Sequence, residues 1–127
     1  YIKESPTFWL DLEPLFDLTL LNRVIRDTYF VTSRPGRTAL MQTCHWLNKH
    51  GVFRAHVIVS SAKGDIARAV NAHALLDDKA GNCLYAAYAS PKTEVYVLDR
   101  PYNRFDAAIV GRRINRVATV EDFLAAI

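Results

Sequence analysis

Cysteine, histidine and acidic side chains are the residues of this 127-residue chain whose chemistry could support catalysis. A thiol becomes a nucleophile when a neighbouring imidazole takes its proton and stabilises the thiolate. A third polar residue then holds the imidazole in the required tautomer. The chain contains two cysteines, four histidines and 13 acidic residues, so its residue types permit such a set.

Motifs of other chemistries are missing from the sequence. There is no Gly-rich phosphate loop, no His-Glu-x-x-His, no Gly-x-Ser-x-Gly and no Cys/His cluster with metal-ligand spacing. Cys44 and His45 are neighbours on a predicted helix and point about 100° apart, so they cannot converge with His50 on one ion. We therefore expect no metal and no cofactor.

Length and composition indicate a single globular domain, because apolar residues make up 50% of the chain and charged residues 23%. No apolar run approaches the roughly 18–20 residues that cross a bilayer, and no signal peptide is visible. Two cysteines are too few for a disulfide framework, so we expect a reduced, cytoplasmic protein without membrane contact. Since the chain begins at Tyr1, we also expect a fragment or a processed product.

The charge balance gives little support to nucleic-acid binding. The formal net charge is +3, and basic residues are scattered apart from Arg112, Arg113 and Arg116. A nucleic-acid-binding module would need these three residues to align with Arg100 and Arg104 on one face. Its binding would also fall steeply with salt.

Hydrophobic periodicity predicts helices first and strands afterwards. Helices are expected over residues 18–30 and 37–50, the second stopped by Gly51, and a short final helix is opened by Thr119. Strands are expected over residues 53–60, 71–78, 83–89, 94–99 and 107–117. Residues 61–70 are expected to form a loop or a short helical turn, and residues 77–82 a hairpin connection.

This order predicts an α+β fold for a body of residues 17–127, preceded by an N-terminal arm of residues 1–16. Two N-terminal helices would pack on an antiparallel sheet of four or five strands, and a short C-terminal helix would follow. The aromatic residues of the arm, Phe8 and Trp9, are expected to hold it against the body.

Four short segments resemble the transglutaminase-like, papain-like cysteine protease superfamily, which includes bacterial members and the leader peptidases of lasso-peptide biosynthesis. The segments are Lys49–Val52, Ala55–Val59, Asn71–Leu76 and Val95–Asp99. The resemblance covers about residues 36–99. It implies a thiol hydrolase that cleaves a peptide or amide bond, with an oxyanion hole of backbone N–H groups.

The resemblance assigns roles to particular residues. His73 matches the family's catalytic histidine as general base, and Asp99 matches the acid that orients it. The family's cysteine opens the helix, where this chain has Gly36–Ala39. Three alternatives follow: Cys44 serves as the nucleophile in a shifted geometry, the domain has lost its nucleophile, or Ala39 replaces it.

The second hypothesis is a non-catalytic domain that binds a protein or peptide through a sheet edge or the aromatic arm. Cys44 would then be a small core residue, since free cysteine is among the most buried residue types. His73 would be a buried histidine satisfied by a backbone carbonyl or by Asp77, and Asp99 would cap a turn. Cys83 is expected to serve packing.

Overall fold

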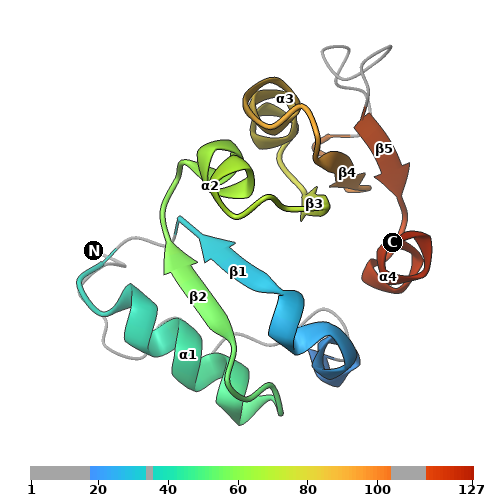
Figure 1. The fold of residues 1–127 in the computed structure, drawn as a ribbon. Helices are drawn as coiled ribbons and strands as arrows, with labels where there is room; N and C mark the ends of the chain where they lie inside the picture. The colour runs from blue at the N-terminus through green and yellow to red at the C-terminus, as the bar shows by residue number, and fades with distance from the viewer. Residues whose placement is uncertain (1–17, 34–35, 104–113) are drawn as a thin grey trace. The chain divides into compact units, whose positions relative to one another are not determined.

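The computed structural model describes residues 18–33, 36–103 and 114–127. The chain divides into two compact units, Tyr1–Ser61 and Ala62–Ile127, and each has a parallel sheet of its own (Figure 1). Some sequence predictions lie outside the described residues: those on the N-terminal arm, on most of the predicted strand 107–117, and on Arg104, Arg112 and Arg113.

The first unit is a β-α-β arrangement preceded by a short helix. Its elements are the 3-10 helix η2 (Leu18–Asp27), strand β1 (Tyr29–Thr32), helix α1 (Ala39–Lys49) and strand β2 (His56–Val59). β1 and β2 pair in parallel, with Tyr29 opposite His56 and Thr32 opposite Val59. Parallel neighbours need a crossover connection, which here contains α1.

Helix α1 has one buried face and ends at a glycine. Its buried residues are Ala39, Gln42, Thr43 and Leu47, at the spacing of one helical face. Gly51 has a φ of +88°, and the Val52 N–H donates to the carbonyl of Leu47 at 2.8 Å. This is the left-handed closure that the glycine predicts, so the predicted second helix and its stop are confirmed.

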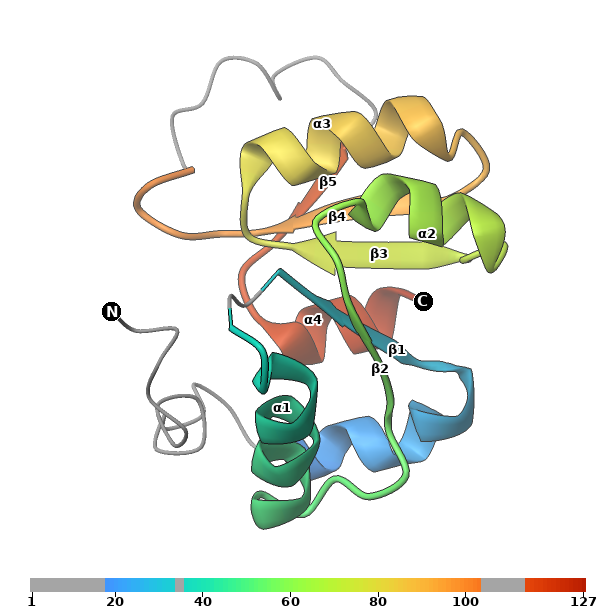
Figure 2. The ribbon, with the colours of Figure 1, turned by 90° about the vertical axis from the view of Figure 1, so that its left-hand side faces the viewer.

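The second unit is a three-stranded parallel sheet with helices on its faces. Its elements are α2 (Lys63–Ala69), β3 (Ala74–Asp77), α3 (Ala80–Ala89), β4 (Glu94–Leu98), β5 (Ile114–Val117) and α4 (Val120–Ala126). The strand order is β3-β4-β5, with Ala74 opposite Glu94 and Val95 opposite Ile114. Figure 2 shows α3 running along the sheet as the crossover between β3 and β4.

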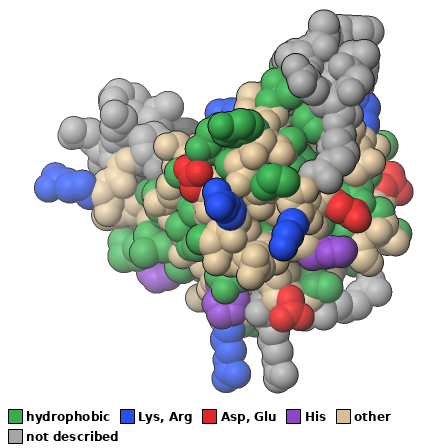
Figure 3. All heavy atoms as spheres, turned by 45° about the horizontal axis from the view of Figure 1, so that its top comes forward, with side chains coloured by type: hydrophobic (Ala, Val, Ile, Leu, Met, Phe, Trp, Pro, Cys, Tyr) green, Lys and Arg blue, Asp and Glu red, His purple; other side chains and the backbone are tan. Residues whose placement is uncertain are grey.

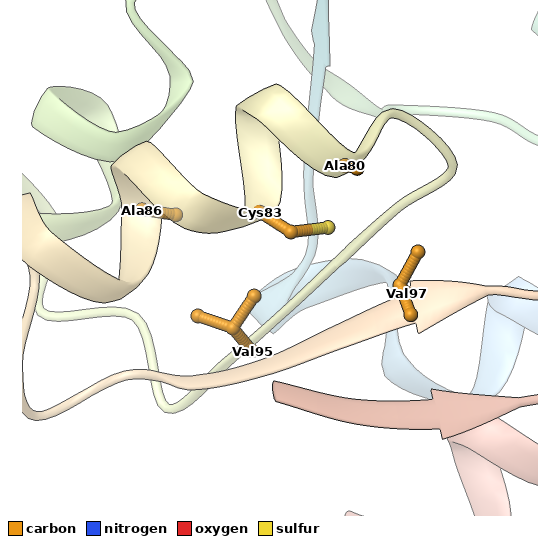
Figure 4. Packing of buried hydrophobic residues seen from close by; sticks show 5 residues of the cluster. All are labelled: Ala80, Cys83, Ala86, Val95 and Val97. Atoms are coloured by element: carbon orange, nitrogen blue, oxygen red, sulfur yellow. The ribbon is translucent and has the colours of Figure 1, made fainter. Parts of the chain in front are cut away.

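The two faces of β4 contact different helices because strand side chains alternate. Val95 and Val97 pack against Ala80, Cys83 and Ala86 of α3 (Figure 4). On the other face, the Tyr96 ring meets the Phe123 ring of α4 edge-on, with 5.1 Å between the ring centroids. β4 is therefore the buried central strand. Its near-continuous apolar sequence is typical of a strand that is covered on both faces.

Gly64 marks the closest approach of α2 to α3. A Cβ at this position would lie 2.8 Å from Tyr85 Cδ2 and 3.0 Å from Ala86 Cα. We expect Gly64→Ala to lower the free energy of unfolding by about 1–3 kcal/mol, because a helix backbone must shift to admit the methyl group. Urea denaturation followed by circular dichroism measures this change.

Gly81→Ala is the matched control for this substitution. Gly81 also lies in a helix, but nothing is within 4 Å of its Cβ position. We expect it to leave stability unchanged or to raise it by up to about 1 kcal/mol through helix propensity. If both substitutions have the same effect, the α2–α3 contact is not the close one that the structure shows.

The predicted antiparallel sheet is wrong. Both sheets are parallel, with two and three strands, and the helices are distributed between the strands instead of gathering at the N-terminus. The decisive error is the predicted strand 83–89, which is most of α3, together with the hairpin predicted over 77–82, which is the end of β3 and the start of α3. In the first unit, the helix predicted to reach residue 30 ends at Asp27, and Tyr29 already begins β1.

Candidate functional site

Charged side chains gather at the carboxyl edge of the three-stranded sheet. β3 ends at Asp77 and β4 at Leu98, and the carboxyl ends of parallel strands are where open α/β sheets bind ligands. A hollow of about 220 Å³ opens at this edge. It is lined by Lys63, Leu76, Asp77, Asp78, Leu98 and Arg100.

Asp77 is held by three donors. Lys63 Nζ lies 2.9 Å and Asn82 Nδ2 3.2 Å from Oδ2, and the backbone N–H of Lys79 donates to Oδ1 at 2.9 Å. The Asp77 side chain is 4% exposed and that of Lys63 is 18% exposed. A carboxylate removed from water needs such partners, so Asp77 fixes Lys63 at the rim of the hollow.

Asp78 follows directly and is half-buried. The Tyr102 hydroxyl donates to its Oδ2. Burial by itself raises the pKa of the Asp78 carboxyl, but the hydrogen bond from Tyr102 and the positive charge of Lys63 help to hold that pKa below its usual value. The hydrogen bond to Asp78 in turn raises the pKa of Tyr102 to about 12. Asp78 is therefore ionised at neutral pH, and Tyr102 is protonated.

Asn103 joins the ends of the three strands. It is 1% exposed, and its Nδ2 donates to the carbonyls of Asp78 at 2.6 Å and Leu98 at 2.8 Å. Its Oδ1 accepts from the Arg100 backbone N–H at 3.1 Å and from Nη1 of Arg116, a β5 residue, at 2.9 Å. The four hydrogen bonds satisfy this buried amide and fix the edge on which Asp78 lies.

The structure does not bring His73 and Asp99 together. His73 precedes β3, and its carbonyl accepts from the Glu94 N–H at the amino end of β4, whereas Asp99 follows the carboxyl end of β4. About 20 Å of parallel strand separates these two levels. His73 is exposed, and Asp99 Oδ1 forms an ion pair with Arg116 at 2.7 Å. Asp99 therefore does not orient His73 in this arrangement.

Cys44, the candidate nucleophile, belongs to the other unit. It lies in α1 and is half-buried. Ala39, the alternative position of a replaced nucleophile, is 2% exposed at the first residue of the same helix. The catalytic role of Cys44 stays a prediction.

Cys83 has the environment of a core residue. It is fully buried between α3 and β4, and its thiol lies 3.7 Å from the carbonyls of Asp77 and Tyr96. Burial, reinforced by the negative charges of Asp77 and Asp78, raises the pKa of this thiol to about 12. It is not available as a thiolate nucleophile at neutral pH.

The sequence did not predict this site: Asp77 was expected only as a partner of His73 and Arg100 only as part of a basic face, and Lys63 and Asp78 were given no role. Asp77 and Asp78 stand directly after the apolar run Ala74–Leu76, which is the signal that could have found them. That signal depends on a parallel sheet, because only then does the end of one strand lie beside the end of the next. Lys63 has no comparable signal, since α2 brings it to Asp77 from 14 residues away.

Among the described residues, the basic side chains on the face shown in Figure 3 form no continuous stripe and lie among acidic and uncharged ones. Within the described ranges, no group of three or more His, Cys, Asp and Glu residues is placed to hold a metal ion. None of the described helices has the length and apolar character to cross a membrane. Comparisons with models of protein families, with curated proteins and with solved structures give no match.

Proposed function

We propose that the unit Ala62–Ile127 binds a phosphorylated small molecule together with a divalent cation. The reaction that this binding supports is phosphate-ester hydrolysis or phosphoryl transfer. The observation that carries the proposal is the meeting of two carboxylates and two cationic side chains in one hollow at the carboxyl edge of a parallel sheet. It departs from the expectation that the chain uses no metal.

The carboxylates supply the cation half of the site. Mg²⁺ prefers oxygen ligands and is commonly held by one or two carboxylates, with water and substrate phosphate completing its coordination. Asp78 suits this role because it is ionised and lines the hollow. Asp77 already accepts from three donors, so its main part is to hold Lys63.

Lys63 and Arg100 supply the phosphate half. Both line the hollow, and ammonium and guanidinium groups are the usual partners of phosphate oxygens. Phosphoryl transfer depends mainly on positioning and on neutralising the charge of the transferred group. The described residues that line the hollow include no Ser, Thr, Cys or His, so the proposal assigns them binding and charge neutralisation, not the attack on phosphorus.

The test is the thermal stability of the whole chain with MgCl₂, with inorganic phosphate and with both. A ligand that binds only the folded state raises the melting temperature, and the rise grows with the logarithm of the ligand concentration above its dissociation constant. We expect the largest rise with both ligands together, because each neutralises the charge of the other. Hydrolysis of p-nitrophenyl phosphate with and without Mg²⁺ is the accompanying measurement of activity.

Two variants connect this result to the site. Asp78→Asn removes the negative charge proposed to bind the cation, and Lys63→Gln removes the positive charge proposed to bind the phosphate. Each variant should lose the rise in melting temperature that MgCl₂ and phosphate give together. Asp65→Asn, on an exposed acid of the neighbouring helix α2, should keep it. A rise that survives in Asp78→Asn, or no rise for the unmodified chain, contradicts the proposal.

The cysteine-hydrolase hypothesis has less support from the geometry, since Asp99 and His73 lie at opposite ends of β4 and Asp99 forms an ion pair with Arg116. The peptide-binding hypothesis gains no specific observation.

A further inference from the structure

Arg116 of β5 bridges the two ends of the segment 99–103, although Arg116 itself does not line the hollow. Its Nη1 donates to Asp99 Oδ1 at 2.7 Å and to Asn103 Oδ1 at 2.9 Å, and its Nη2 donates to the Asn103 carbonyl at 3.0 Å. One guanidinium therefore contacts the first and the last residue of this segment. Arg100, which the proposed function assigns to the phosphate, lies between them and lines the hollow.

Arg100 is held by the same two residues that Arg116 contacts. Its Nη1 donates to the Asp99 carbonyl at 2.8 Å, and its backbone N–H donates to Asn103 Oδ1 at 3.1 Å. The Asn103 oxygen thus accepts from both arginines. A long side chain that is already held in place loses less rotamer freedom when it binds a ligand, so these contacts favour binding through Arg100.

We propose that Arg116 is a positioning residue that holds Arg100 in place for the phosphate group. This inference rests on the proposed function and adds to it a residue from β5, a strand none of whose residues, Ile114–Val117, lines the hollow. The ion pair with Asp99 neutralises the charge of Arg116. The contribution of Arg116 is therefore geometric, and it is not a third phosphate ligand beside Lys63 and Arg100.

The three contacts require the shape of arginine as well as its charge. A guanidinium is planar and presents its donors in a fixed fork, whereas a lysine ammonium is a compact charge on a flexible stem. Arg116 uses two nitrogens of the fork to reach three acceptors on two residues. A lysine at this position would keep the charge and lose the fixed arrangement.

The cation half of the site does not depend on Arg116. Asn103 holds the Asp78 backbone through Nδ2, which donates to the Asp78 carbonyl, whereas Arg116 contacts the oxygens of Asn103. A substitution of Arg116 leaves the bond to Asp78 in place. We therefore expect it to weaken the binding of phosphate and not that of the cation.

The experiment compares two titrations of the full chain: inorganic phosphate in the presence of MgCl₂, followed by calorimetry, and Mn²⁺ alone, with the free ion counted by electron paramagnetic resonance. Arg116→Met keeps the aliphatic stem and removes the donors. We expect it to bind phosphate about 5-fold more weakly, because Arg100 must then be immobilised on binding, and to bind Mn²⁺ no more weakly. Arg116→Lys should also bind phosphate more weakly. Arg68→Met, on an exposed arginine of α2, removes the same charge and should bind both ligands like the unmodified chain.

A second measurement follows Arg100 itself without any ligand. The ¹⁵N relaxation of its Nε–H should show a more mobile side chain in Arg116→Met and in Arg116→Lys than in the unmodified chain. A loss of stability that left Arg100 equally rigid would contradict the proposal. Adding Arg116→Met to Arg100→Met should cause no further loss of phosphate affinity, since a residue that acts through Arg100 has no effect once Arg100 is gone.

The outcomes separate this inference from the proposed function. If the unmodified chain binds no phosphate in the presence of MgCl₂, the proposed function fails and the role of Arg116 falls with it. If the unmodified chain binds phosphate and both Arg116 variants bind it equally well, only the role of Arg116 is refuted. If Arg116→Lys binds like the unmodified chain while Arg116→Met binds more weakly, the effect is one of charge and the positioning role is wrong. Equal losses for phosphate and Mn²⁺ would indicate a general structural role and would refute it as well.

Discussion

Asn103→Leu is expected to lower the free energy of unfolding by about 3 kcal/mol. Leucine has nearly the shape of asparagine but offers no hydrogen bond, and the site is 1% exposed. The carbonyls of Asp78 and Leu98 and the N–H of Arg100 would lose the partners that the amide gives them. Each buried polar group left without a partner costs about 1–3 kcal/mol, with part recovered by relaxation of the turn. Amide hydrogen exchange of β4 in native buffer measures the loss.

The matched control is Asn115→Leu. Asn115 lies on β5, is exposed, and makes one long contact of 3.5 Å from Nδ2 to the Val95 carbonyl. The same chemical change should cost within about 0.5 kcal/mol there. A small cost for Asn103→Leu would show that the turn closes without its amide, and that the four hydrogen bonds do not hold the edge of the sheet together.

Asn103→Leu also has a consequence for the proposed site. Asn103 holds the backbone on which Asp78 lies, and it accepts from the backbone N–H of Arg100. Under conditions where the variant remains folded, its affinity for Mn²⁺ should therefore fall as well. A purely structural role would lower stability and leave the affinity of the folded protein unchanged.

Individual helices and strands could be predicted from the sequence where the local sequence signals agreed. The predicted helix 37–50 is α1, because its apolar spacing and the glycine after it agree. The predicted strand 94–99 is β4, and Thr119 caps α4 by accepting from the Asp122 N–H at 3.1 Å. In these cases local chemistry and the final packing favour the same conformation.

The sheet topology was not readable, because it depends on one ambiguous segment. Residues 83–89 are an apolar run too short to distinguish a strand from a buried helix by periodicity. Extended back to Ala80, the segment contains four alanines, the strongest helix formers, and its buried residues recur every third position. A helix there supplies the crossover that parallel β3 and β4 need, whereas a strand there favours an antiparallel hairpin. One wrong element therefore reversed the sheet.

Because the sheet topology was predicted wrongly, the candidate site could not be predicted either. In an antiparallel reading, Asp77 and Asp78 are turn residues of a hairpin, and His73 is the more conspicuous side chain of the same segment. In the parallel sheet the two acids mark a strand end beside the end of β4, and Asn103 ties these ends together. No periodic pattern in the sequence predicts the role of Asn103, because that role consists of hydrogen bonds to groups at the ends of three different strands.

Asp77→Ala is expected to have an effect as large as that of Asn103→Leu, about 3 kcal/mol. The substitution leaves Lys63, whose side chain is 18% exposed, without its ion-pair partner, and it leaves the Lys79 N–H and the Asn82 amide without their acceptor. Removing one member of a buried pair costs about 3–5 kcal/mol, and the partial exposure of Lys63 places this case at the lower end. Urea denaturation measures the change, with Asp65→Ala, on an exposed acid of α2, expected to cost less than about 1 kcal/mol.

A second substitution at Lys63 shows why Asp77→Ala is destabilising: either the Lys63 charge is left without a partner, or packing is lost in general. Lys63→Met removes the charge and keeps the aliphatic stem, so adding it to Asp77→Ala removes the unpaired ammonium. The double variant should therefore be more stable than the sum of the two single losses predicts, by about 1–3 kcal/mol. Additive losses would mean that Lys63 and Asp77 do not interact strongly in solution. The fixed position of Lys63, on which the proposed phosphate contact depends, would then lose its physical basis.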